Sequence, residues 1–141
     1  MPQPQWRPIS FLPSLAHHID GMLKDDQDQY TNLLRAKNKP HVLDDFTVNE
    51  VIRVFSTAKA DLPLFDEQLR RWGAEQKLTN TQRQEIIRLK AQMQKLHEVV
   101  EQILTLANEL SKGTIQKVMA KSDEQLGLEA LMRMLGGEQK S

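Results

Sequence analysis

Apolar residues between positions 81 and 112 recur at alternating gaps of three and four residues. This spacing puts them on one face of a helix, and it is the heptad pattern of helices packed lengthwise. A helix of about 32 residues would be about 48 Å long and needs other helices to cover its apolar face in water. The sequence therefore predicts a helical bundle. The residues of this first seam are Ile86, Leu89, Met93, Leu96, Val100, Ile103, Ala107 and Leu110.

A second heptad seam lies between positions 47 and 72. Thr47 and Glu50 have the spacing of a capping box, which predicts that the helix starts there. Pro63 lies within the pattern, and we expect it to kink the helix because the heptad phase continues through it. A break at which Asp61 caps a new helix is the alternative. The seam consists of Val51, Phe55, Ala58, Leu62, Phe65, Leu69 and Trp72.

The N-terminal part of the chain predicts an arm followed by a third long helix. Four prolines in residues 1–13 favour an extended arm, in which Phe11 covers the end of the bundle or Trp6 anchors a partner protein. A helix is predicted from Ser14, as its N-cap, to about residue 37. Its apolar face has a polar gap at residues 25–29. This helix should therefore pack less continuously than the other two.

The short segment between the two seams, residues 73–80, forces the second and third long helices to be antiparallel neighbours. Thr81 and Gln84 have capping-box spacing, and Gly113 is expected to end the third helix as a C′ glycine. Short helices should follow, with the last at 123–135. The predicted fold is all-α: an antiparallel bundle of three long helices, of which the second and third form a long hairpin, plus short C-terminal helices. The bundle domain spans 14–135, between the arm at 1–13 and a tail at 136–141.

The last predicted helix is apolar around much of its circumference. One intramolecular groove cannot cover so wide an arc, and a patch of several hundred Å² left exposed is unusual for a monomer. We therefore expect a homodimer with two-fold symmetry, in which each copy covers the other. The alternative is that these residues are buried within one chain. The predicted interface comprises Leu126, Leu128, Leu131, Met132, Met134 and Leu135.

Charge and composition narrow the possible classes of partner. Basic and acidic side chains number 19 each, whereas nucleic-acid-binding domains normally carry a basic surface. Arg70, Arg71 and Lys77, beside Trp72, form one small basic cluster, so nucleic-acid contact is an alternative to protein binding. The chain has no cysteine, no signal-peptide pattern and no apolar run long enough to span a membrane. We expect a cytoplasmic protein without a membrane partner.

Histidine and carboxylate pairs on the predicted helices are the candidates for metal binding. Helical bundles hold metals with inward-facing Glu and His side chains, but the Glu-x-x-His motif of di-iron bundles is absent here. Solvated or rim-packed histidines are the simpler interpretation. The acidic cluster Asp25, Asp26 and Asp28 should form a solvated face or a polar layer that sets helix register. The candidate ligands are His17, His18, Asp20, His97 and Glu101.

No catalytic or cofactor-binding motif is present in the sequence. The best interpretation is a non-enzymatic helical protein that acts through protein contacts, as an adaptor or accessory protein, and that self-associates. The first alternative is a helical bundle, enzymatic or not, that binds a metal or a small molecule. Nucleic-acid binding is the second.

Overall fold

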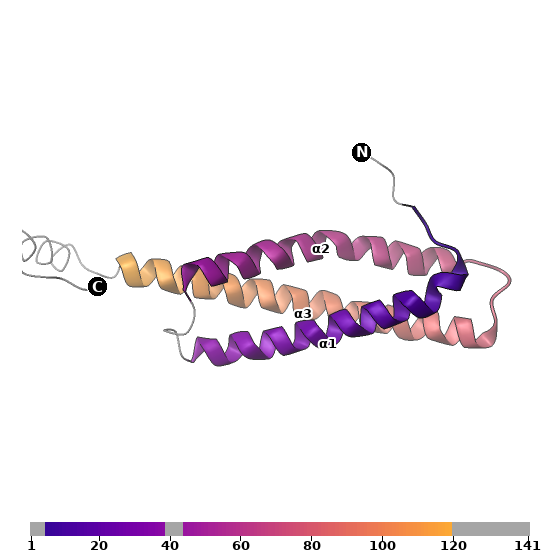
Figure 1. Ribbon diagram of the computed structural model, residues 1–141, viewed down its shortest axis with the longest axis horizontal. Helices are drawn as coiled ribbons and strands as arrows, with labels where there is room; N and C mark the ends of the chain where they lie inside the picture. The colour runs from indigo at the N-terminus through magenta and orange to yellow at the C-terminus, as the bar shows by residue number, and fades with distance from the viewer. Residues whose placement is uncertain (1–4, 39–43, 120–141) are drawn as a thin grey trace, which may run out of the picture.

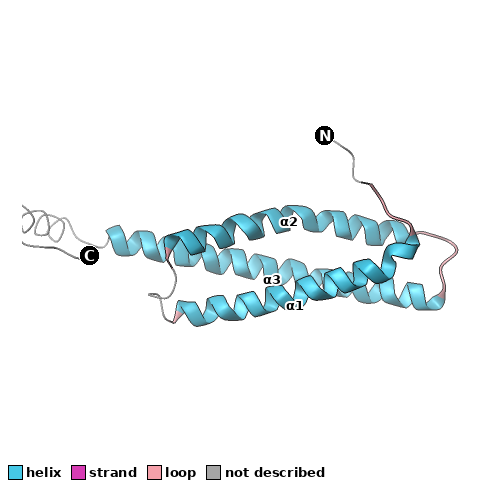
Figure 2. Cartoon of the chain, viewed as in Figure 1, coloured by secondary structure: helices cyan, strands magenta, loops and turns pink. Residues whose placement is uncertain are grey.

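The computed structural model describes residues 5–38 and 44–119 of the chain, with side chains as far as residue 112. Three long helices make up most of it: α1 (Leu12–Lys37), α2 (Asp45–Gly73) and α3 (Asn80–Met119) (Figure 1). A short 3-10 helix, η1 (Ile9–Phe11), leads into α1. The described residues contain no strand (Figure 2). The prediction of an all-α bundle is confirmed.

The helices run up, down and up along one common axis, and α3 packs against both of the others. Between α2 and α3 the order is antiparallel, because Asp66 bonds to His97 while Lys59, earlier in α2, pairs with the later Glu101. Between α1 and α3 the order is parallel. Asp20 pairs with Arg88 near one end of the two helices, and Lys37 Nζ lies 4.0 Å from a carboxylate oxygen of Glu109 near the other end. The predicted α2–α3 hairpin is therefore confirmed, with α1 alongside it.

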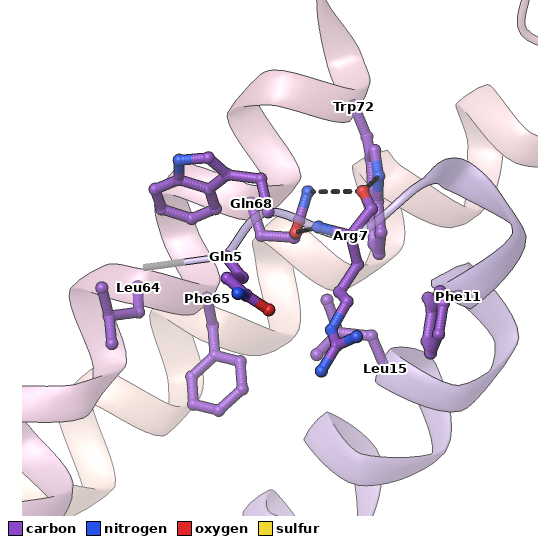
Figure 3. Close-up of a pocket in the computed structure, with 9 residues that line it drawn as sticks. Gln5, Arg7, Phe11, Leu15, Leu64, Phe65, Gln68 and Trp72 are labelled. Carbon is purple, nitrogen blue, oxygen red and sulfur yellow. Dashed lines mark hydrogen bonds between the residues drawn. The ribbon is translucent and has the colours of Figure 1, made fainter. Parts of the chain in front are cut away.

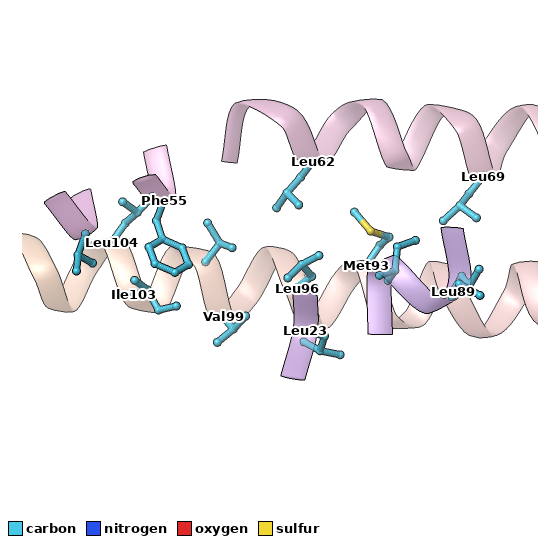
Figure 4. Packing of buried hydrophobic residues seen from close by; sticks show 14 of the residues in the cluster. Leu23, Phe55, Leu62, Leu69, Leu89, Met93, Leu96, Val99, Ile103 and Leu104 are labelled. Carbon is cyan, nitrogen blue, oxygen red and sulfur yellow. The ribbon is translucent and has the colours of Figure 1, made fainter. Parts of the chain in front are cut away.

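The core follows the predicted seams. Every residue of the α3 seam is buried except Leu110, which is half-buried (Figure 4). Burying one such leucine or isoleucine contributes about 1.5–3 kcal/mol. The α3 side chains Val99, Leu104 and Leu106 are also buried, although they lie outside the heptad seam. They are covered because α1 and α2 pack against α3 from two directions, which widens its buried arc beyond that of a helix with one partner.

The helix starts differ from the predicted ones by a few residues. Asp44, not Thr47, caps α2: its carboxylate accepts a hydrogen bond of 2.8 Å from the Thr47 N–H, which lowers the pKa of Asp44. The capping box of α3 joins Thr79 and Gln82, two residues before the predicted pair, and each side-chain oxygen accepts from the other residue's backbone N–H. Ser14 does not cap α1, which begins at Leu12 directly after η1. The prediction of an extended arm as far as residue 13 is accordingly wrong for η1 and the first helical residues.

Neither the alternative break of α2 at Asp61 nor the predicted end of α3 at Gly113 occurs. The helix α2 continues through Pro63, so the alternative of a break at Asp61 is wrong. The helix α3 continues through Gly113 to Met119, which overturns both the predicted C′ glycine and the separate helix after it. A glycine inside a helix costs only about 1 kcal/mol relative to alanine, too little to end a helix of this length. The last turns of α3 extend past the ends of α1 and α2 (Figure 1). The predicted helix at 123–135 lies outside the described residues.

Candidate interaction site at the N-terminal arm

The main chain of the N-terminal arm is held by side chains of α2. The Arg7 N–H donates a hydrogen bond of 2.7 Å to Gln68 Oε1, and Gln68 Nε2 donates one of 3.5 Å to the Arg7 carbonyl oxygen. The same carbonyl accepts a bond of 2.8 Å from Trp72 Nε1 (Figure 3). Gln68 and Trp72 are one helical turn apart, so both reach the arm from one face of α2. We call this pair of side chains the arm clamp.

The geometry of the clamp suits any extended residue. In an extended segment the N–H and C=O of one residue point to the same side, and a carboxamide can accept from the first while donating to the second. Gln68 is only 7% exposed, and it is the buried polar residue among those the structure describes. A buried amide without partners would be costly, so the arm satisfies both of its polar atoms. The clamp therefore recognises the backbone of the arm and not a particular side chain.

Two cation–π contacts fix the side chains of the arm. The guanidinium of Arg71 lies 4.4 Å from the ring centroid of Trp6, and that of Arg7 lies 5.1 Å from the centroid of Phe11. Arg71 also pairs with Glu67 at 3.2 Å. The Arg7 guanidinium, by contrast, has no ion pair or hydrogen bond within residues 5–38 and 44–112. One cation thus lies at this surface without a carboxylate partner.

A cavity of about 320 Å³ lies between the arm, α1 and α2, next to the clamp (Figure 3). Its walls are mainly apolar, and the rim residues Phe11 and Leu64 are 41% and 45% exposed. The other large apolar side chains exposed on the described surface, such as Leu34 and Ile87, are not part of this cavity. Two exposed apolar side chains thus border this cavity, whereas Leu34 borders a separate hollow of about 380 Å³ whose lining includes Lys37, Glu101 and Glu109. It is lined by Gln5, Trp6, Arg7, Phe11, Leu15, Leu64, Phe65, Gln68 and Trp72.

The structure does not bring the predicted metal ligands together. Asp20 accepts hydrogen bonds from Arg88 and Gln92, and the bond from Arg88 lowers the pKa of Asp20. His97 lies 2.6 Å from an oxygen of Asp66 on α2, and Glu101 pairs with Lys59. Within residues 5–38 and 44–112, no three His, Asp or Glu side chains form a cluster that could hold a metal.

The two adjacent histidines of α1 are exposed. The ring of His18 packs against that of Phe65, with centroids 5.6 Å apart, so it helps to join α1 to α2 beside the cavity. His17 lies near Asp20 and lowers its pKa slightly through its charge, the smallest of the contributing effects. Both histidines thus lie at the rim of the bundle.

The predicted basic cluster is divided by its contacts. Arg70 forms a two-point ion pair with Glu67, at 2.6 and 2.8 Å, while Arg71 bonds to the same carboxylate and stacks on Trp6. Lys77 is exposed in the turn between α2 and α3. Asp66, one helical turn before Arg70, faces His97 across the helix interface. Two of the three cations are therefore already neutralised or stacked.

The acidic cluster of α1 divides between core and surface. Asp25 and Asp28 are exposed, while Asp26 is half-buried in the seam between Leu23 and Tyr30. Burial raises the pKa of Asp26 to about 6, and the neighbouring charge of Asp25 adds to the effect. The predicted solvated face thus describes Asp25 and Asp28, whereas the role of Asp26 as a polar layer that sets helix register stays a prediction.

No sequence pattern predicts the clamp: the sequence marks Trp6 as a possible anchor and Trp72 as a core residue, but it does not place the arm against α2. Gln68 lies outside the heptad seam and resembles any solvent-facing glutamine until the arm is placed over it.

No helix among residues 5–38 and 44–119 combines the length and apolar character needed to cross a membrane. Comparison of the chain with protein-family models, curated proteins and solved structures found no match.

Proposed function

We propose that this chain is a non-enzymatic interaction protein whose partner-binding surface is the cavity beside the arm clamp. The observation that carries the proposal is that α2 side chains hold an extended main chain next to an apolar cavity that this main chain leaves open. Helical proteins commonly bind partner segments in such apolar grooves, and backbone hydrogen bonds add affinity without restricting sequence. The role we infer is that of an adaptor or accessory protein.

The electrostatics of the described surface support this choice over the alternatives from the sequence. The histidine and carboxylate side chains proposed as metal ligands mostly engage partners in other helices, and Arg70 and Arg71 share the carboxylate of Glu67. Exposed Phe11 and Leu64 instead offer apolar area at the cavity rim. Aromatic and aliphatic anchors in such pockets supply most of the binding energy at protein interfaces. The cytoplasmic setting remains a prediction.

The test is a photo-cross-linking residue placed at Leu64 in the full chain and expressed in its native cell. We expect a discrete cross-linked protein, because position 64 borders the cavity. The matched control carries the same residue at Gln94, which is exposed on α3 and does not line the cavity. Adding Phe11→Asp to the Leu64 probe should weaken the cross-link, since it places a charge on the apolar rim.

Circular dichroism of each variant checks that the helices persist. Equal cross-linking from positions 64 and 94, or none from position 64, would overturn the proposal. A cross-link that Phe11→Asp leaves unchanged would also contradict it, because the partner would then not depend on the rim.

A further inference from the structure

We propose that the partner of this cavity is a second copy of the chain, whose C-terminal segment around Glu124, Leu128, Leu131 and Leu135 enters it. The inference rests on the proposed function, since it names the occupant of the same cavity. The resulting dimer is closed and two-fold, with each copy's C-terminal segment in the other copy's cavity.

The cavity specifies the chemistry of its occupant. Its walls from α1 and α2 are apolar, and the Arg7 guanidinium at its edge has no carboxylate partner within the described residues. An occupant with an apolar side chain and an adjacent carboxylate would fill the space and pair with Arg7. Opposite charge at the rim of an interface adds mainly specificity, while the apolar side chains supply most of the affinity.

The chain's own C-terminal sequence has this chemistry. Leu128, Leu131 and Leu135 are spaced by three and four residues, so in a helix they share one face. Glu124 precedes Leu128 by four residues and falls on the same face, whereas Glu129 falls about a third of a turn away from that face. The segment therefore offers a carboxylate and a row of leucines together, as the cavity requires. The segment lies outside the described residues.

Distance favours a second copy over the same chain. The contact of Asp66 with His97 sets the level of the cavity along α3, and α3 ends at Met119. From 97 to 119 a helix rises about 33 Å, whereas from 120 to 128 it rises only about 12 Å. A helical C-terminal segment that turned straight back would thus end far from its own cavity. A second copy lying antiparallel has no such limit, and the last turns of α3 extend past the ends of α1 and α2 (Figure 1).

The test is a charge exchange in the full-length chain, read by sedimentation or light scattering over a range of concentrations. The wild-type chain should reach twice the single-chain mass of 16.3 kDa. Arg7→Glu and Glu124→Arg should each weaken the dimer about tenfold, and the double variant should restore it because the ion pair is re-formed in reverse. Glu129→Arg is the matched control and should leave the dimer unchanged.

Cross-linking between isotopically light and heavy copies identifies the contact directly. A probe at Leu64 should join the C-terminal peptide of the other isotope. A monomer at every concentration, a dimer indifferent to both charge reversals, a double variant without recovery, or cross-links only within one isotope would each overturn the proposed contact of the C-terminal segment with the cavity of a second copy. In those cases a cross-link from position 64 to a different protein would still support the proposed function, whereas none to any protein would reject both.

Discussion

Asp26 shows how one polar side chain in an apolar seam makes stability depend on pH. Burial raises its pKa in the folded chain to about 6, above the ordinary value of 3.8. The folded state therefore binds the Asp26 proton more tightly than the unfolded state. Its contribution to stability is fully present below pH 3.8 and is lost as the pH rises through about 6.

We expect Asp26→Asn to raise the free energy of unfolding above pH 6, because the amide has no charge to desolvate. After allowance for the half-exposed position, the gain should be about 1 kcal/mol. It should vanish below about pH 3, where wild-type Asp26 is mostly protonated in both states. Urea unfolding at several pH values measures it, and exposed Asp28→Asn serves as the control. A gain that stayed constant across this pH range would mean that burial of the charge is not the cause.

Gln68 makes a second prediction at the scale of one residue. Replacing it with alanine removes both hydrogen bonds to the Arg7 main chain, although Trp72 Nε1 still reaches the Arg7 carbonyl oxygen. The Arg7 amide should lose its protection against hydrogen exchange, and the free energy of unfolding should fall by about 1–2 kcal/mol.

The matched control for this change is Gln94→Ala on the exposed face of α3, which should alter stability by less than about 0.5 kcal/mol. If the Arg7 amide in Gln68→Ala exchanged as slowly as in the wild type, the clamp would not hold the arm in solution.

At the scale of helices, Gly21 lies in the interior of α1 without a packing reason. A Cβ added there meets no atom within 4 Å, so alanine fits without strain. Gly21→Ala should raise the free energy of unfolding by about 0.5–1 kcal/mol, because alanine loses less backbone entropy in a helix. Thermal unfolding followed by circular dichroism measures the gain.

Gly73 provides the comparison for this substitution. It is the last residue of α2, and an added Cβ would lie 3.4 Å from Lys90 Nζ. Gly73→Ala should therefore raise the free energy of unfolding by less than Gly21→Ala does. An equal gain at both positions would show that neither the helix interior nor the neighbouring lysine matters.

The helices could be predicted from sequence more reliably than their ends. Heptad spacing extends over many residues and fixes which face is buried, so Leu96 and Ile103 could be assigned to the core. A helix cap depends on one hydrogen bond, and the residues that could form it lie close together in the sequence. Asp44 and Thr47 both suit the start of α2, and Thr79 and Thr81 both suit the start of α3. The path of the backbone decides which of these residues caps the helix, and the local sequence does not encode that path.

At the scale of the whole molecule, the candidate site depends on contacts between distant parts of the chain, so local sequence does not predict it. Gln68 is buried only because residues 5–8 cross over it, a contact between positions about sixty residues apart in sequence. Helical periodicity predicts which faces of long helices are buried against each other, but a short irregular arm has no periodic pattern from which its contacts could be predicted. The apolar cavity likewise arises from three segments at once. Such sites depend on tertiary placement, whereas the seams depend on local spacing.

The central position of α3 predicts that the bundle unfolds as one unit. Leu96 is fully buried, and Figure 4 places it between Leu62 of α2 and Leu23 of α1. Leu96→Ala should therefore loosen both interfaces and lower the free energy of unfolding by about 2–5 kcal/mol. Ile87→Ala, on a side chain 64% exposed, should change it by less than about 0.5 kcal/mol.

Two probes measured on the same Leu96→Ala samples test the cooperativity. Far-ultraviolet circular dichroism reports all three helices, while tryptophan fluorescence, from Trp72, 1% exposed in the core, and from Trp6 in the arm, reports the arm end of the bundle. Both urea transitions should shift together, because α1 and α2 share α3 as their packing partner. A fluorescence transition that moved away from the circular dichroism transition would mean that the α2–α3 hairpin keeps its structure after α1 has detached.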